Sequence, residues 1–68
     1  MLSGVAVGEC GRLFVAEHRR LQVLTLEGLP LQVLELPGAV ELSQIRLGGG
    51  QAFVVDEVTH QVHVLRVL

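Results

Sequence analysis

The 68 residues can form only one small folded unit, because a chain of this length buries about 60% of its unfolded surface. Half of the residues are apolar, 18% are charged and the mean hydropathy is +0.56, a composition that excludes disorder. The net charge is −2, lysine is absent and two phenylalanines are the only aromatic residues, so we expect no nucleic-acid partner. Cys10 is the only cysteine, which excludes an internal disulfide and a zinc site built on cysteines.

Targeting signals are not visible in the sequence. Residues 1–9 lack the basic segment and the apolar core of a secretory signal, because Glu9 interrupts the apolar run. No apolar run approaches the roughly 18 residues that a membrane helix needs. We therefore expect a cytoplasmic protein with no membrane partner.

Glycine and proline divide the chain into short segments, with turn signals at residues 8–11, 27–30, 37–38 and 48–50. The segments between these turns are rich in β-branched residues, and several of them alternate as half-buried strands do. In chain order the expected strands are 5–7, 12–16, 21–26, 31–36, 45–47, 52–55 and 61–65. The predicted fold class is all-β and antiparallel.

An internal repeat relates the two halves of the chain. An offset of 39 residues aligns 11–27 with 50–66 without a gap and gives six identities in seventeen positions. Phe14 falls on Phe53 and Val15 on Val54, while Glu17 meets Asp56. A period near 39 that contains only short strands favours the blades of a β-propeller over a helical solenoid.

The first copy also resembles a known repeat. Its sequence reads Gly-Val-Ala-Val at residues 4–7, Gly-Arg-Leu-Phe-Val-Ala-Glu at 11–17, His-Arg-Arg-Leu-Gln-Val-Leu at 18–24 and Glu-Gly at 27–28. This pattern is similar to the NHL repeat, which forms one propeller blade. Two departures are Glu17, where the repeat has aspartate, and the absence of an arginine before Gln61 in the second copy.

The resemblance implies about two NHL-type blades that do not close a ring. Residues 1–38 would form a four-stranded first blade and residues 39–68 a degenerate three-stranded second blade, with Phe14, Val15, Phe53 and Val54 between the two sheets. Propeller rings typically hold about 4 to 8 blades. We therefore expect the chain to be the C-terminal part of a larger propeller, as a fragment, a short isoform or the product of a gene model that is too short.

Catalytic and metal chemistry find little support in the sequence. His60 and His63 are three apart on an expected strand, so their side chains would point to opposite faces of the sheet and could not share one ion. The three glycines at 48–50 lack the following Lys-Ser or Lys-Thr of a phosphate-binding loop and fit a tight hairpin turn. We predict no enzyme activity, no metal and no cofactor.

The candidate interaction residues lie on turns and on the last strand. The charged turn at residues 17–20 would lie at the propeller rim, beside the connection at 37–41 and the second copy's turn at 56–60. The strand at 61–65 would lack its outer strand partner. The candidates are Glu17, His18, Arg19, Arg20, Glu57 and His60 on the rim, and Val62 and Val64 on the edge strand. We expect self-association through the exposed blade faces and this last strand.

The resemblance implies a non-catalytic protein-interaction module, such as the substrate-recruiting end of a tripartite-motif or related ubiquitin ligase. Its expected partner is a protein or the remainder of a propeller. Three alternatives remain open: a piece of a propeller-fold enzyme of the lyase or lactonase type, an RNA-binding NHL surface, and a translated fragment without a function of its own. The sequence does not identify the parent protein.

Overall fold

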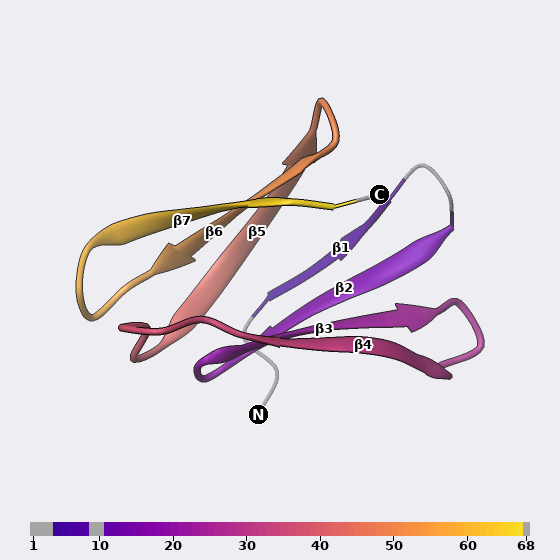
Figure 1. The fold of residues 1–68 in the computed structure, drawn as a ribbon, viewed down its shortest axis with the longest axis horizontal. Coiled ribbons are helices and arrows are strands. Elements are labelled where there is room, and N and C mark those ends of the chain that lie inside the picture. The colour runs from indigo at the N-terminus through magenta and orange to yellow at the C-terminus, as the bar shows by residue number, and fades with distance from the viewer. Residues whose placement is uncertain (1–3, 9–10, 68) are drawn as a thin grey trace.

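All seven elements of the computed structural model are β-strands; the structure describes residues 4–8 and 11–67 (Figure 1). They form two antiparallel sheets, one with the strand order β1-β2-β3-β4 and one with β5-β6-β7. The strands are β1 Gly4–Val7, β2 Arg12–Glu17, β3 Arg20–Thr25, β4 Pro30–Glu35, β5 Leu42–Gly48, β6 Gln51–Asp56 and β7 Gln61–Arg66. The expected all-β antiparallel fold is therefore confirmed. Cys10 lies outside the described residues.

Short turns join consecutive strands within each sheet. The glycine positions predict the β3–β4 and β5–β6 turns, whereas the β2–β3 and β6–β7 turns contain no glycine and have positive φ at His18 and His60. Gly48 pairs with Gln51 across the β5–β6 hairpin, and the two residues between them, Gly49 and Gly50, have φ angles of 59° and 76°. A two-residue hairpin loop of type I′ requires positive φ at both central residues, which glycine adopts without a steric penalty. The three consecutive glycines thus serve as a hairpin turn.

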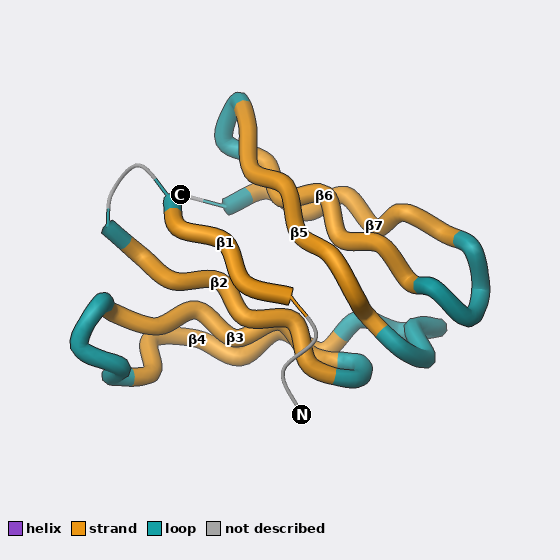
Figure 2. The backbone as a smooth tube through the Cα atoms, turned by 180° about the vertical axis from the view of Figure 1, so that it is seen from behind, coloured by secondary structure: helices purple, strands orange, loops and turns teal. Residues whose placement is uncertain are grey.

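The two sheets stand beside each other with their first strands closest together. Strands β1 and β5 lie side by side without pairing, while β4 and β7 form the distant edges of the two sheets (Figures 1 and 2). Each sheet is a simple meander in which every strand pairs with the next one in sequence. The second edge of β7 is consequently free of a strand partner within the described residues.

The hydrophobic core lies between one face of each sheet. Cross-strand pairs define these inner faces, because residues directly opposite in antiparallel strands share a face. The inner face of the four-stranded sheet carries Ala6, Phe14, Ala16, Leu21 and Val23. The inner face of the three-stranded sheet carries Ile45, Leu47, Ala52, Val54 and Leu65. Leu36, Ala39 and Leu42, in or next to the connection, complete the core.

Two of the four residues expected between the sheets lie on the outer faces instead. Phe14 and Val54 belong to the core cluster, as expected. Val15 pairs with Val5 and Gln22 on the opposite face of the four-stranded sheet, and Phe53 pairs with Arg46 and Val64 on the opposite face of the three-stranded sheet. The expectation for Val15 and Phe53 was wrong because successive residues of one strand point to opposite faces.

The repeats stack in the same orientation. The inner face of the four-stranded sheet includes Phe14 and Val23, whose repeat equivalents Phe53 and Val62 lie on the outer face of the three-stranded sheet. In a sandwich whose repeats are related by a two-fold axis, the same face of each repeat would meet. Here opposite faces of equivalent sheets meet, so the stack has two unlike outer faces.

Gly4 permits the close approach of β1 and β5. A Cβ atom added at this position would lie 2.6 Å from the carbonyl oxygen of Ser43 and 3.2 Å from the Cα atom of Gln44. Both neighbours are backbone atoms, which cannot move away by a change of rotamer. Gly4 is therefore required by the spacing of the two sheets rather than by its own backbone conformation.

We predict that Gly4→Ala forces β1 and β5 apart and lowers the free energy of unfolding by about 1–3 kcal/mol, as overpacking does. Urea denaturation at one fixed protein concentration measures this change. Gly48→Ala is the matched control, because its added Cβ would have no atom within 4 Å in the described part of the chain beyond its own chain neighbours. Equal stability of the two variants would contradict the assigned close contact.

Candidate protein-interaction surfaces

Three connecting segments meet at one end of the two sheets. The β2–β3 turn contains His18 and Arg19, the connection between the sheets spans 36–41, and the β6–β7 turn spans 57–60. Backbone hydrogen bonds join the first turn to the connection: Leu42 N donates to His18 O at 2.7 Å, and Leu36 N donates to Arg19 O at 3.1 Å. We call these three segments the rim.

The connection is joined to the second turn as well. Glu57 N donates to Glu41 O at 3.0 Å, and His60 N donates back to Asp56 O at 3.0 Å. His18 Nδ1 lies 3.2 Å from Glu41 Oε1, a contact that depends on the charge and tautomer of an exposed histidine. The backbone contacts therefore organise the rim, and the exposed side-chain pair adds little.

Asp56 anchors the rim from inside. It is the last residue of β6, and its side chain is fully buried. Its carboxylate accepts hydrogen bonds from the connection, at 2.6 Å from Val40 N and 3.3 Å from Glu41 N. It also accepts hydrogen bonds from the β6–β7 turn, at 3.0 Å from Val58 N and 3.2 Å from Thr59 N. One buried carboxylate thus holds two of the three rim segments together.

The charge of Asp56 is favoured by this arrangement. Burial by itself raises the pKa of the carboxyl, but the four backbone N–H groups together outweigh burial and hold the pKa well below its ordinary value. Sequence reasoning did not select Asp56 as a key residue. The signal that could have found it is its alignment with Glu17 in the repeat, at the end of the second strand of each copy.

We predict that Asp56→Asn destabilises the protein at pH 7 and removes part of its acid sensitivity. Because the folded-state pKa is lowered, the stabilisation is complete above the pKa of an unfolded aspartate, about 3.9, and is lost as the pH falls below it. The check is the free energy of unfolding measured between pH 7 and pH 2. The exposed Glu57→Gln is the control, and parallel acid profiles for wild type and Asp56→Asn would contradict the assignment.

The rim contains a shallow positively charged groove. An open hollow of about 470 Å³ is lined by His18, Arg19, Arg20, Glu35 and Val40. Within the described part of the chain, neither arginine forms an ion pair. The guanidinium groups are therefore available to a carboxylate from outside the chain.

The structure groups some of the predicted interaction residues and separates others. Glu17 lies opposite Arg20 in the backbone register at the end of the β2–β3 hairpin, next to His18 and Arg19. Glu57 and His60 lie on the neighbouring β6–β7 turn of the same rim. Val62 and Val64 are exposed on the outer face of the three-stranded sheet, away from the core. The prediction thus covers two distinct surfaces.

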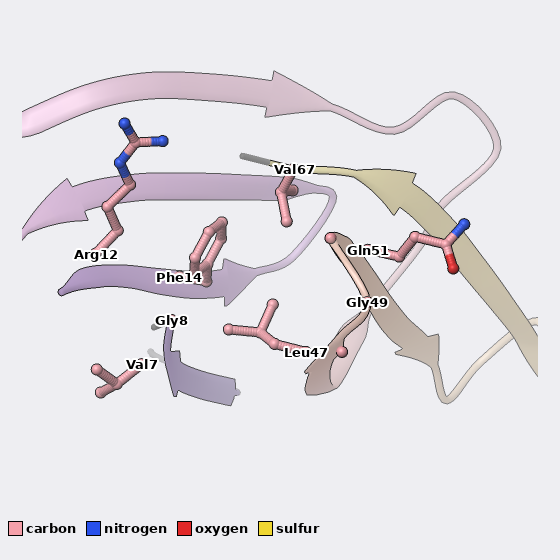
Figure 3. Close-up of a pocket in the computed structure, with 10 residues that line it drawn as sticks. Val7, Gly8, Arg12, Phe14, Leu47, Gly49, Gln51 and Val67 are labelled. Atoms are coloured by element: carbon pink, nitrogen blue, oxygen red, sulfur yellow. The ribbon is translucent and has the colours of Figure 1, made fainter. Parts of the chain in front are cut away.

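A second hollow, of about 270 Å³, lies between the β1–β2 and β5–β6 hairpins (Figure 3). Its lining includes the aliphatic residues Val7, Leu47 and Val67 together with Phe14 and Arg12. The rest of the lining is glycine and Gln51. The sequence marked the glycine turn but not this hollow, because its walls come from both repeats.

The histidines do not form a metal site in the described part of the chain, where no group of three or more His, Cys, Asp or Glu residues could hold an ion. His60 is in the β6–β7 turn and adopts a positive φ of 59°. His63 lies on β7 opposite Val54, on the inner face. Its Nε2 atom is buried and has no hydrogen-bond partner among the residues that the structure describes. The repeat equivalent of His63 is Leu24, an apolar residue.

We predict that His63→Leu stabilises the protein by about 1 kcal/mol, because a buried polar atom without a partner costs about 1–3 kcal/mol. Chemical denaturation at pH 7 measures the change. His63→Gln is the control, since it retains a polar group at the same place and should bring no gain. Destabilisation by His63→Leu would show that the imidazole has a favourable role.

Comparison with protein-family models, with curated proteins and with solved structures found no match to this chain. Within residues 4–8 and 11–67 the structure has no helix that is long and apolar enough to cross a membrane.

Proposed function

We propose that this chain is a non-catalytic protein-interaction module formed by two neighbouring blades of an NHL-type propeller, such as the substrate-recruiting end of a ubiquitin ligase. Its partner would bind at the rim. The observation that carries the proposal is the convergence of three backbone-linked connecting segments, with two arginines in an open groove, at one end of the sheets.

The stacking of the sheets supports the blade interpretation. Propeller blades follow one another around an axis, so each blade meets the next through unlike faces. Phe14 on the inner face of the first sheet and its equivalent Phe53 on the outer face of the second have this relation. The adjacent positions of β1 and β5 also agree with first strands that lie nearest a common axis.

The chemistry of the groove favours a partner that presents carboxylates. Arg19 and Arg20 carry planar guanidinium groups, which bind a carboxylate through two parallel hydrogen bonds. The backbone bond from Leu36 N to Arg19 O fixes the β2–β3 turn and reduces the entropy lost on binding. We infer that an acidic segment of a partner protein occupies this groove.

We expect Arg19→Ala combined with Arg20→Ala to weaken partner binding at least about tenfold, because a hydrogen bond to a charged group contributes about 1.5–3 kcal/mol. Cross-linking in cells with the full chain would recover the partner, and titration of the purified partner would measure the affinity of each variant.

Arg46→Ala combined with Arg66→Ala is the matched control for this experiment. Both of these arginines are exposed on the three-stranded sheet, so the control removes the same charge from another surface. The control should retain the partner. Equal affinity of the two double variants, or binding of single-stranded RNA in place of a protein, would contradict the proposed function.

A further inference from the structure

We infer that copies of this chain associate head to tail, the outer face of the three-stranded sheet of one copy packing against the outer face of the four-stranded sheet of the next. The inference deepens the proposed function by naming a second copy as a partner, and it rests on the blade-like stacking described above.

The chain already contains one such contact between unlike sheet faces. Within one molecule, the face with Phe14 and Val23 packs against the face with Val54. The outer face of the three-stranded sheet carries the equivalents of the first two residues, Phe53 and Val62. The outer face of the four-stranded sheet carries Val15, the equivalent of Val54. The outer face of the three-stranded sheet therefore matches the inner face of the four-stranded sheet. In the same way, the outer face of the four-stranded sheet matches the inner face of the three-stranded sheet.

Both outer faces also expose apolar side chains to solvent. Val62 and Val64 on β7 are 58% and 52% exposed, and Val5 and Val7 on β1 are 53% and 62% exposed. Covering such side chains releases roughly 25 cal/mol for each Å² of apolar surface removed from water. Contiguous apolar patches on a small protein mark interaction sites.

The geometry also specifies the symmetry of the assembly. A contact between two unlike faces is heterologous, so it propagates until a ring closes or an open stack forms. Each copy contributes two sheets, and closed rings of this architecture hold about 4 to 8 sheets. A closed ring would therefore contain about two to four copies.

The experiment blocks each outer face separately. Val62→Glu with Val64→Glu places charges on the outer face of the three-stranded sheet, and Val5→Glu with Val7→Glu does so on the outer face of the four-stranded sheet. All four side chains are more than half exposed, so the monomer should still fold. Val33→Glu, on β4 of the same outer face, replaces the β1 variant if that variant fails to fold.

The measured quantity is the mass in solution at tens of micromolar, by analytical ultracentrifugation. Wild type should have at least about twice the mass of the 7.4 kDa chain, and each blocked variant alone should be a monomer. An equimolar mixture of the two blocked variants should form a one-to-one dimer, because each retains the face that the other lacks. Leu26→Glu with Leu29→Glu, two exposed residues in the β3–β4 turn, should associate as wild type does.

Three results would overturn the inference: a monomeric wild type, a blocked variant that self-associates like wild type, or a mixture of folded blocked variants that stays monomeric. Contact through the free edge of β7 would give the second result, because the β1 variant would keep that edge. Loss of head-to-tail association with retained, arginine-dependent partner binding would refute this inference alone. Retained head-to-tail association, with partner binding that does not depend on the arginines, would refute only the proposed function of the rim.

Discussion

The apolar contact between the inner faces of the two sheets is the interaction on which the rest of the structure depends. Each sheet alone would expose the apolar side chains of its inner face to water, and the packing of the two sheets covers them. Phe14 and Val54 occupy the centre of a single core that both repeats build. Gly4 lets the first strands approach at backbone distance, so the spacing of the sheets is set by a missing side chain as well as by the packed ones.

The polar organisation of the rim follows from that packing. Once the sheets are side by side, the connection between them passes over the end of β6, where Asp56 accepts its backbone N–H groups. A buried carboxylate is favourable only when it is fully hydrogen-bonded, and four backbone donors meet that requirement. Asp56 thereby fixes the connection and the β6–β7 turn, while backbone hydrogen bonds from Leu36 N and Leu42 N hold the β2–β3 turn. The side chains of Arg19 and Arg20 take no part in these bonds.

Stacking in one orientation also explains why so many aliphatic side chains remain exposed. A sandwich of two sheets would cover its apolar faces and leave polar ones outside. In this chain the strands are apolar on both faces, as in Phe14-Val15 and Phe53-Val54, and one core covers only half of them. The proposed head-to-tail association would cover the apolar faces that this stacking leaves exposed.

The sequence by itself determined the strands, the turns and the repeat. Glycine and proline mark most of the turns through local φ preferences, but the β2–β3 and β6–β7 turns contain neither and have positive φ at His18 and His60. The expected strands differ from the observed ones mostly by one or two residues, with β5 beginning three residues earlier than expected. Only the tertiary structure decided which face of each sheet is inside, because both faces are apolar and alternation alone cannot rank them. It also decided the role of Asp56, whose four hydrogen-bond donors come from segments up to 16 residues away along the chain. Local preferences act between neighbours in sequence, whereas these contacts exist only after the two sheets have packed.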